Sequence, residues 1–127
     1  MTCFWDSILS SLNQEDFNLL GEKKKTNRIE FIKILKNKNK LTNALWQNKP
    51  LKNQEKKEHF EAIKDYNISG IRNGHLTSIC DSFLLLICDL LKINIEHRFL
   101  NTTIIYSISN SRKTVRFKSN KGHFSRA

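Results

Sequence analysis

The sequence predicts an α+β fold with N-terminal helices, a buried central helix and a small C-terminal antiparallel sheet. Three observations predict it: helical spacing of apolar residues in the first half, a strongly apolar run at residues 83–91, and an alternating pattern after Lys92. At 127 residues the chain has the length of one domain, which we assign to residues 1–127. Its 39% hydrophobic and 27% charged residues are typical of a globular protein.

Two helices are predicted in the first 40 residues. Residues 3–12 are apolar at positions 4, 5, 8, 9 and 12, which is the spacing of one helix face, and Thr2 stands where an N-cap belongs. The same pattern recurs over residues 27–36, and the polar residues 37–40 that follow are expected to end that helix.

Residues 41–46 continue the helical spacing for a short segment. Pro50 suits the first turn of a further helix, because proline lacks the N–H that this position leaves unpaired. We expect that helix to reach about Tyr66, with Phe60 and Ile63 facing inward. The whole first half is therefore predicted to be helical.

A loop is predicted at residues 67–74, where Gly70 and an Asn-Gly pair occur. Thr77 and Ser78 can cap the helix that follows, and Asp81 suits its first turn. Residues 83–91 are apolar on nearly every side, which indicates a helix buried on all faces.

After Lys92 the alternating pattern predicts three strands, centred on residues 93–97, 104–108 and 115–117. A loop of hairpin length, residues 109–113, joins the last two, and a turn at residues 119–122 leads to His123 and Phe124. His97 shares a strand face with Ile93 and Ile95 and is predicted to be structural. Three aromatic residues with apolar neighbours are predicted to be core: Phe99, Tyr106 and Phe117.

Three cysteines and no recognisable secretory signal predict free thiols in an intracellular, reducing compartment. Cys80 and Cys88 stand eight residues apart on the apolar helix and are predicted to be core. Together with His59 and His75 they lack the paired spacing of structural zinc sites, so we expect no metal and no cofactor. No apolar run approaches the roughly 20 residues that span a bilayer, so no membrane partner is expected.

Residues 21–57 form a basic segment, predicted to be helical, within this single domain. They contain 12 of the 22 Lys and Arg residues but only 3 of the 12 Asp and Glu residues, which makes the net charge of +10 regional. Such a region favours anionic partners, either nucleic acid or an acidic protein surface such as a capsid protein, or it is simply a solvated face. The candidate anion-binding residues are Lys23, Lys24, Lys25, Lys33, Lys36 and Lys40.

The candidate chemistry lies at the two ends of the chain. Cys3 begins the first predicted helix, and a helix N-terminus stabilises a thiolate through its unpaired N–H groups and the aligned peptide dipoles. A cysteine nucleophile also needs an imidazole within hydrogen-bond reach, and His123, which follows a tight turn at the end of the sheet, is the candidate base. This prediction requires the two chain ends to meet.

The residues Cys3-Phe4-Trp5-Asp6-Ser7-Ile8 resemble the nucleophile helix of ovarian-tumour (OTU) domain cysteine proteases. The order of the C-terminal half, a buried helix, alternating strands and a His-aromatic pair at residues 123–124, is also similar to that family. The resemblance implies a papain-like fold, a Cys3–His123 peptidase, and Ser125 at the position where the family orients its histidine. It leaves residues 13–70 unmatched.

The resemblance implies a protein or peptide substrate, with a ubiquitin-like isopeptide as one candidate, and a miniature domain as in large DNA viruses. Host cytoplasm or the virion is then the expected location. The chain departs from the family at the oxyanion hole, since only Met1 and Thr2 precede Cys3, and at Ser125, where the family has Asp or Asn. The alternative is a non-catalytic basic structural protein, such as a virion component that contacts nucleic acid or capsid proteins.

Overall fold

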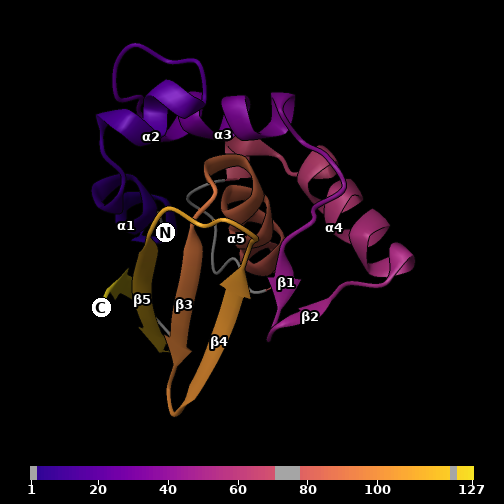
Figure 1. Cartoon of the computed structure of the whole chain (residues 1–127). Helices are drawn as coiled ribbons and strands as arrows, with labels where there is room; N and C mark the ends of the chain where they lie inside the picture. Colours follow the sequence, from indigo (N-terminus) through magenta and orange to yellow (C-terminus); the bar gives the residue numbers. More distant parts are fainter. Residues whose placement is uncertain (1–2, 71–77, 121–122) are drawn as a thin grey trace.

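The helices and strands of this chain form a sheet with helices gathered on one side (Figure 1). The computed structural model describes residues 3–70, 78–120 and 123–127, and of Cys3, Gly70 and Ser78 only the backbone. In chain order the elements are α1 (Cys3–Ser11), α2 (Gln14–Leu19), α3 (Arg28–Asn37), β1 (Leu45–Trp46), β2 (Lys49–Pro50), α4 (Asn53–Asp65), a 3-10 turn η1 (Ile68–Gly70), α5 (Ser78–Leu91), β3 (Asn94–Phe99), β4 (Thr102–Ser107), β5 (Thr114–Asn120) and β6 (His123–Arg126).

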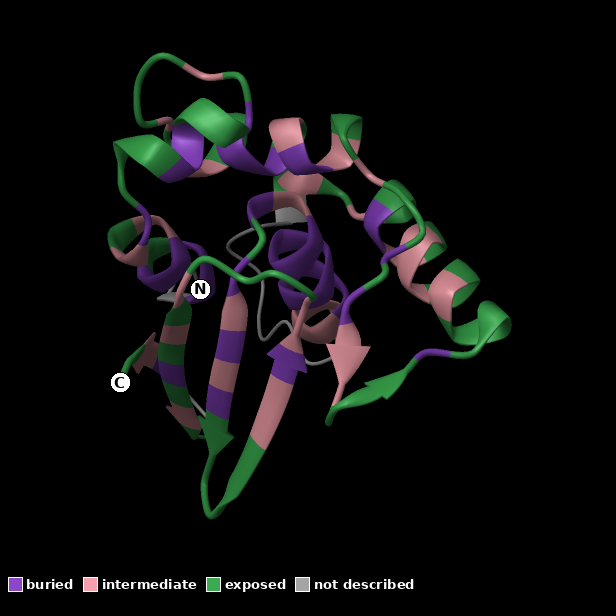
Figure 2. Cartoon of the chain, viewed as in Figure 1, coloured by how far each residue is buried: buried purple, intermediate pink, exposed green. Residues whose placement is uncertain are grey.

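The predicted α+β class is confirmed. The strands form one sheet in the order β2-β1-β4-β3-β5-β6. Helix α5 lies between this sheet and the other helices, because it contacts β3 and β4 on one side and α2, α3 and α4 on the other. Figure 2 shows α5 as the most continuously buried element, as its apolar sequence predicts.

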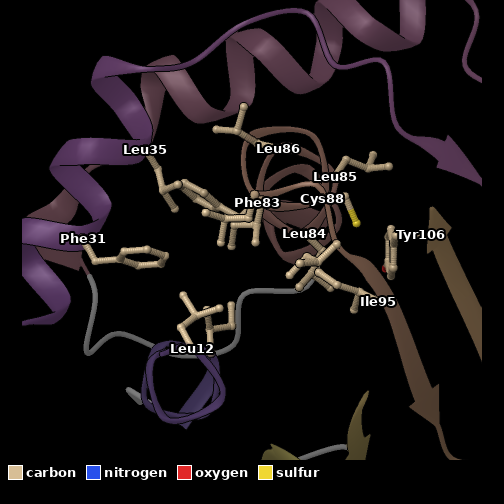
Figure 3. Close-up of a cluster of buried hydrophobic side chains, with 14 of the residues drawn as sticks. Leu12, Phe31, Leu35, Phe83, Leu84, Leu85, Leu86, Cys88, Ile95 and Tyr106 are labelled. Atoms are coloured by element: carbon tan, nitrogen blue, oxygen red, sulfur yellow. The ribbon is translucent and has the colours of Figure 1, made fainter. Parts of the chain in front are cut away.

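The core is continuous on both sides of α5 (Figure 3). On the helical side, Phe83 extends toward Phe31 of α3, and both rings are fully buried. On the sheet side, Leu84 lies near Ile95 of β3 and Tyr106 of β4, which are also buried. One apolar helix therefore supplies the contacts that join the helical layer to the sheet.

The helices predicted over residues 3–12 and 27–36 are confirmed, with ends within one residue of the expected ones. Asn27 caps α3, since its side-chain oxygen accepts the N–H of Glu30 at 2.9 Å. Helix α2 was not predicted. It is six residues long, too short for apolar periodicity, and it begins with a capping box in which Asn13 and Asp16 bond reciprocally at 3.1 and 2.8 Å.

The prediction of helix through residues 41–50 is wrong. Gln47 and Asn48 have φ values of 49° and 64° and form the two-residue turn of a hairpin between β1 and β2, with Pro50 in β2. The chain before β1 is held extended by contacts with α5, since Thr42 donates to Leu85 O at 3.2 Å. The basic segment 21–57 is therefore not helical throughout, and α4 begins only at Asn53.

The turn predicted at residues 67–74 contains η1, and residues 71–74 lie outside the described residues, as do Thr77 and His75. The predicted central helix is confirmed as α5, which includes all of residues 83–91.

The prediction that β4 and β5 form a hairpin is wrong, and the sheet is mixed. After β4 the chain crosses the end of β3, so that β5 pairs with β3 in parallel and β4 pairs with β3 on its other edge. The crossing segment is bonded over the start of β3, where Arg112 N donates to Lys92 O at 2.7 Å and Asn94 N donates to Lys113 O at 2.9 Å. The antiparallel pairing of β5 with β6 follows.

Tyr106 and Phe117 are core residues as predicted, but the prediction for Phe99 is wrong. Phe99 belongs to the same sheet face as His97 and is 40% exposed, because it is the last residue of β3, where the helical layer no longer covers the sheet.

The crossing segment forms ion pairs with a buried carboxylate, which the sequence pattern did not indicate. Asp16 is fully buried and accepts hydrogen bonds from Arg112 at 2.6 Å and Lys113 at 2.7 Å. Burial opposes ionisation of this carboxyl, but the bonds from Arg112, Lys113 and the Asn13 N–H outweigh it and lower the pKa of Asp16. The pair joins α2 to the crossing segment, 96 residues away in the sequence.

We predict that Asp16→Asn lowers the free energy of unfolding by about 2 kcal/mol, because it removes the buried carboxylate that accepts charged hydrogen bonds from the partly exposed Arg112 and Lys113. Since the folded state lowers the Asp16 pKa, this stabilisation is complete at pH 7 and is lost as the pH falls below about 4. Urea denaturation of both proteins at pH 7 and pH 3 measures it. Glu15→Gln is the control, because Glu15 is 72% exposed and lies 3.8 Å from the same guanidinium. An equal loss in both variants would contradict the prediction.

Candidate active site

The two ends of the chain pack against each other, through α1 and β6. The rings of Phe4 and Phe124 are 4.9 Å apart, and Ser7 Oγ donates to Phe124 O at 3.0 Å. One turn further along α1, the Ser10 carbonyl accepts a hydrogen bond from Arg126 Nη1 at 3.2 Å. The helix and the strand therefore run in the same direction, in contact along their length.

This contact determines how the backbones of Cys3 and His123, the predicted nucleophile and base, lie relative to each other. Because Ser10 lies against Arg126 and Ser7 against Phe124, one more helical turn brings the start of α1 level with the start of β6. Cys3 is the first residue of α1 and His123 the first residue of β6. The side chain of Cys3 lies outside the described part of the structure.

Trp5 holds α1 in this position. Its side chain is fully buried and contacts rings from three other elements: Phe31 at 6.1 Å, Tyr66 at 6.4 Å and Phe83 at 4.7 Å between centroids. The aromatic pair at positions 4 and 5 thus has a structural role on two sides, with Phe4 against β6 and Trp5 in the core.

His123 and Ser125 share one face of β6, since side chains two residues apart in a strand point the same way. His123 is exposed and pairs in register with Asn120, whereas Ser125 is partly buried and pairs with Lys118. Phe124, between them, points to the core. The imidazole of His123 therefore points away from the core, while the neighbouring Phe124 packs β6 against α1.

A second imidazole, His97, lies on the core face of the same region. It is 8% exposed, its Nε2 lies 2.6 Å from Ser119 Oγ, and its ring is 5.0 Å from that of Phe124. Burial lowers the pKa of His97, which favours the neutral ring. The predicted structural role fits this position, although Nδ1 is buried with no hydrogen-bond partner among the described residues.

The two other cysteines lie away from this corner, on α5. Cys88 is fully buried, and burial raises the pKa of its thiol well above the usual range. Cys80 is partly buried and packs against the core. Both positions agree with the predicted core role, and the Cys88 thiol is unsuited to nucleophilic chemistry.

The predicted anion-binding lysines divide into two groups. Lys36 donates to the carbonyls of Lys64 (2.9 Å) and Tyr66, and so caps the end of α4. Lys40 pairs with the buried carboxylate of Asp89 at 3.2 Å. Four others are exposed and have no carboxylate within ion-pair distance in the described chain: Lys23, Lys24, Lys25 and Lys33.

Comparison of this chain with protein families, curated proteins and solved structures gave no match. In the part of the chain that the structure describes, no three metal-ligating side chains come together. None of the described helices has the length and apolar character needed to span a bilayer.

The contact between Phe4 and Phe124 is predicted to couple the two chain ends energetically. A double-mutant cycle of Phe4→Ala and Phe124→Ala, measured by urea denaturation, should give a coupling free energy of about 1 kcal/mol, as for other edge-to-face ring pairs. The same cycle with Phe4→Ala and Phe60→Ala is the control, because Phe60 lies on α4. Coupling no larger than in the control would show that the ring contact contributes nothing to α1–β6 packing.

Proposed function

We propose that this chain is a cysteine peptidase with a papain-like, OTU-like arrangement, in which Cys3 is the nucleophile and His123 the general acid and base. The observation that carries the proposal is the packing of α1 on β6 with both running in the same direction, which brings the first turn of the helix level with the first residue of the strand. The order of elements from α5 to β6 supports it as well, since it agrees with the order that the resemblance implies.

The local structure suits each role. Helix α1 has nine residues, so its N-terminal N–H groups and peptide dipoles stabilise a thiolate at Cys3. His123 is exposed, and a substrate can therefore reach it. Ser125, on the same face of β6, is the candidate to orient the imidazole.

The reaction then follows the usual thiol course. The Cys3 thiolate forms a bond to the carbonyl carbon of the scissile amide, and the tetrahedral intermediate is stabilised by N–H donors at the start of α1. Its collapse breaks the C–N bond while the His123 imidazolium donates a proton to the leaving amine. Water then attacks the thioester, imidazole takes its proton, and the C–S bond breaks to release the acid and the thiolate.

We predict that Cys3 reacts with iodoacetamide at pH 6 and that His123→Ala slows this labelling by about tenfold or more, because a cysteine with an ordinary pKa near 8.5 is almost entirely a thiol at that pH. Mass spectrometry of digested protein measures the rate at each cysteine. Cys88, buried and with a raised pKa, is an internal control that should remain unlabelled in the folded protein.

A second histidine provides the matched control. His59 is partly buried on α4, where its Nδ1 lies 2.8 Å from Ser82 Oγ, so His59→Ala should leave Cys3 labelling unchanged. Ser125→Ala should slow it only a few-fold, in line with an orienting role. Cys3 labelling that is equally fast in His123→Ala and in the unaltered chain would refute the Cys3–His123 pair.

A non-catalytic, anion-binding role is the second candidate function, in which the partner is nucleic acid or a capsid protein. It is favoured by the exposed ammonium groups of Lys23, Lys24, Lys25 and Lys33, which form no ion pair with any described carboxylate and are clustered in the sequence around the start of α3. Backbone electrostatics would dominate such binding, with little reading of base sequence.

This role predicts salt-sensitive binding of a labelled single-stranded oligonucleotide, measured by fluorescence anisotropy. Affinity should fall steeply between 50 and 200 mM salt. Replacing Lys23, Lys24 and Lys25 by Ala together should weaken binding about tenfold or more, whereas Cys3→Ala should leave it unchanged. Binding that is independent of salt and of these lysines would exclude the role.

A further inference from the structure

The face of the sheet that points away from α5 carries a group of cations next to His123. In the parallel pairing of β3 with β5, Arg98 stands opposite Lys118, and in the antiparallel pairing of β5 with β6, Lys118 stands opposite Ser125. These three residues form one row across three strands. Directly paired residues share a face, so the row lies on the same side of the sheet as His123.

The neighbouring rows extend this surface. Asn120 and His123 form the row on one side, and Glu96 and Arg116 the row on the other. Arg98, Arg116 and Lys118 are all exposed, and we call them the cationic sheet face. The alternation of burial along β5, with Phe117 buried between exposed Arg116 and Lys118, agrees with a face that no described helix covers (Figure 2).

The charge of this face is largely uncompensated. Glu96 is its one carboxylate among the described residues, and it lies 3.5 Å from Arg116 Nε. Arg98 Nε donates to Leu100 O at 3.3 Å, but neither Arg98 nor Lys118 has a carboxylate within ion-pair distance in the described chain. Two free cations therefore stand one row from the proposed catalytic imidazole.

We infer that the cationic sheet face selects peptides with an acidic side chain close to the scissile bond. The inference rests on the proposed peptidase function and names its substrate class. Alternate side chains of an extended peptide are about 6.7 Å apart, which is also the separation of successive same-face residues in a strand. When the scissile bond of a substrate lies at His123, an acidic side chain about two residues from that bond lies over Arg98 and Lys118.

The face suits a peptide better than a nucleic acid. The Phe and Tyr residues of β3 to β6 belong to the opposite, core-side face, namely Phe99, Tyr106, Phe117 and Phe124, so the described part of this face offers a base no Phe, Tyr or Trp ring to stack on. The cations of its described part lie in neighbouring rows beside His123, which matches a short acidic segment.

Binding to Cys3→Ala protein tests the inference without requiring catalysis. Two fluorescein-labelled decapeptides are compared by anisotropy, one with two Glu residues at its centre and one with two Gln residues there. The acidic peptide should bind more tightly, and the double variant R98E/K118E should weaken its binding by about tenfold while leaving the neutral peptide unaffected. The matched control is K49E/K57E, which makes the same charge change at two exposed lysines on β2 and α4 and should retain the preference.

Three outcomes would overturn the inference, and a fourth would overturn only the proposed catalysis. Equal binding of the two peptides would do so, as would equal losses in R98E/K118E and K49E/K57E, which would indicate long-range electrostatics only. Tighter binding of an oligonucleotide of equal charge, lost in R98E/K118E, would assign the face to nucleic acid. If the acidic preference is present but no peptide is cleaved by the chain with Cys3 intact, the proposed catalysis fails while the binding face stands.

With Cys3 intact, cleavage of the same peptides supplies a second readout. The ratio of kcat/KM for the acidic over the neutral peptide should fall about tenfold in R98E/K118E, with iodoacetamide labelling of Cys3 unchanged. An unchanged ratio in that variant would overturn the inference, whatever the absolute rate.

Discussion

The burial of α5 is the constraint on which the rest of the structure depends. A helix that is apolar on every side must be covered on every side, and here β3 and β4 cover one side while three helices cover the others. Because a single helix separates the two layers, side chains such as Phe83 and Leu84 determine how far apart and at what level they lie (Figure 3). The N-terminal helix α1 and the C-terminal strand β6 can then pack against each other.

Buried carboxylates complete this arrangement where apolar contacts end. Asp16 joins α2 to the segment that crosses the end of β3, and Asp89 joins the C-terminal end of α5 to Lys40, to Lys92 and to the Asn43 N–H. Bonds from these partners outweigh burial and lower the pKa of Asp89 as well. Part of the strong positive charge of the chain is therefore structural, and the remainder lies on exposed surfaces.

The sheet places two histidines on opposite faces. His97 faces the core, where burial favours its neutral form and its ring supports Phe124, whereas His123 faces outward at the start of β6. Phe124 connects the two, because it packs against His97 and also against Phe4 of α1. Strand β6 thus packs the two chain ends together through Phe124 and exposes the imidazole of His123 on its other face, beside the exposed cations of β3 and β5.

The sequence by itself determined the elements whose signal is local. The periodicity of residues 3–12 and 27–36 predicted α1 and α3, and the apolar run predicted α5, because these patterns depend on neighbours within one or two turns. The hypothesis of a Cys3–His123 pair likewise came from local signals, since a helix N-terminus and a turn each have a recognisable pattern.

Only the tertiary structure decided the β1–β2 hairpin, the strand order and the contact between the chain ends, because these features depend on contacts between distant residues. Residues 41–46 have helical spacing, yet packing on α5 and the turn at Gln47 and Asn48 make them extended. Residues 109–113 have hairpin length, yet the ion pairs of Asp16 direct them across β3. The contact of α1 with β6 and the row of cations across three strands likewise follow from strand order and register, which periodicity within one segment does not encode.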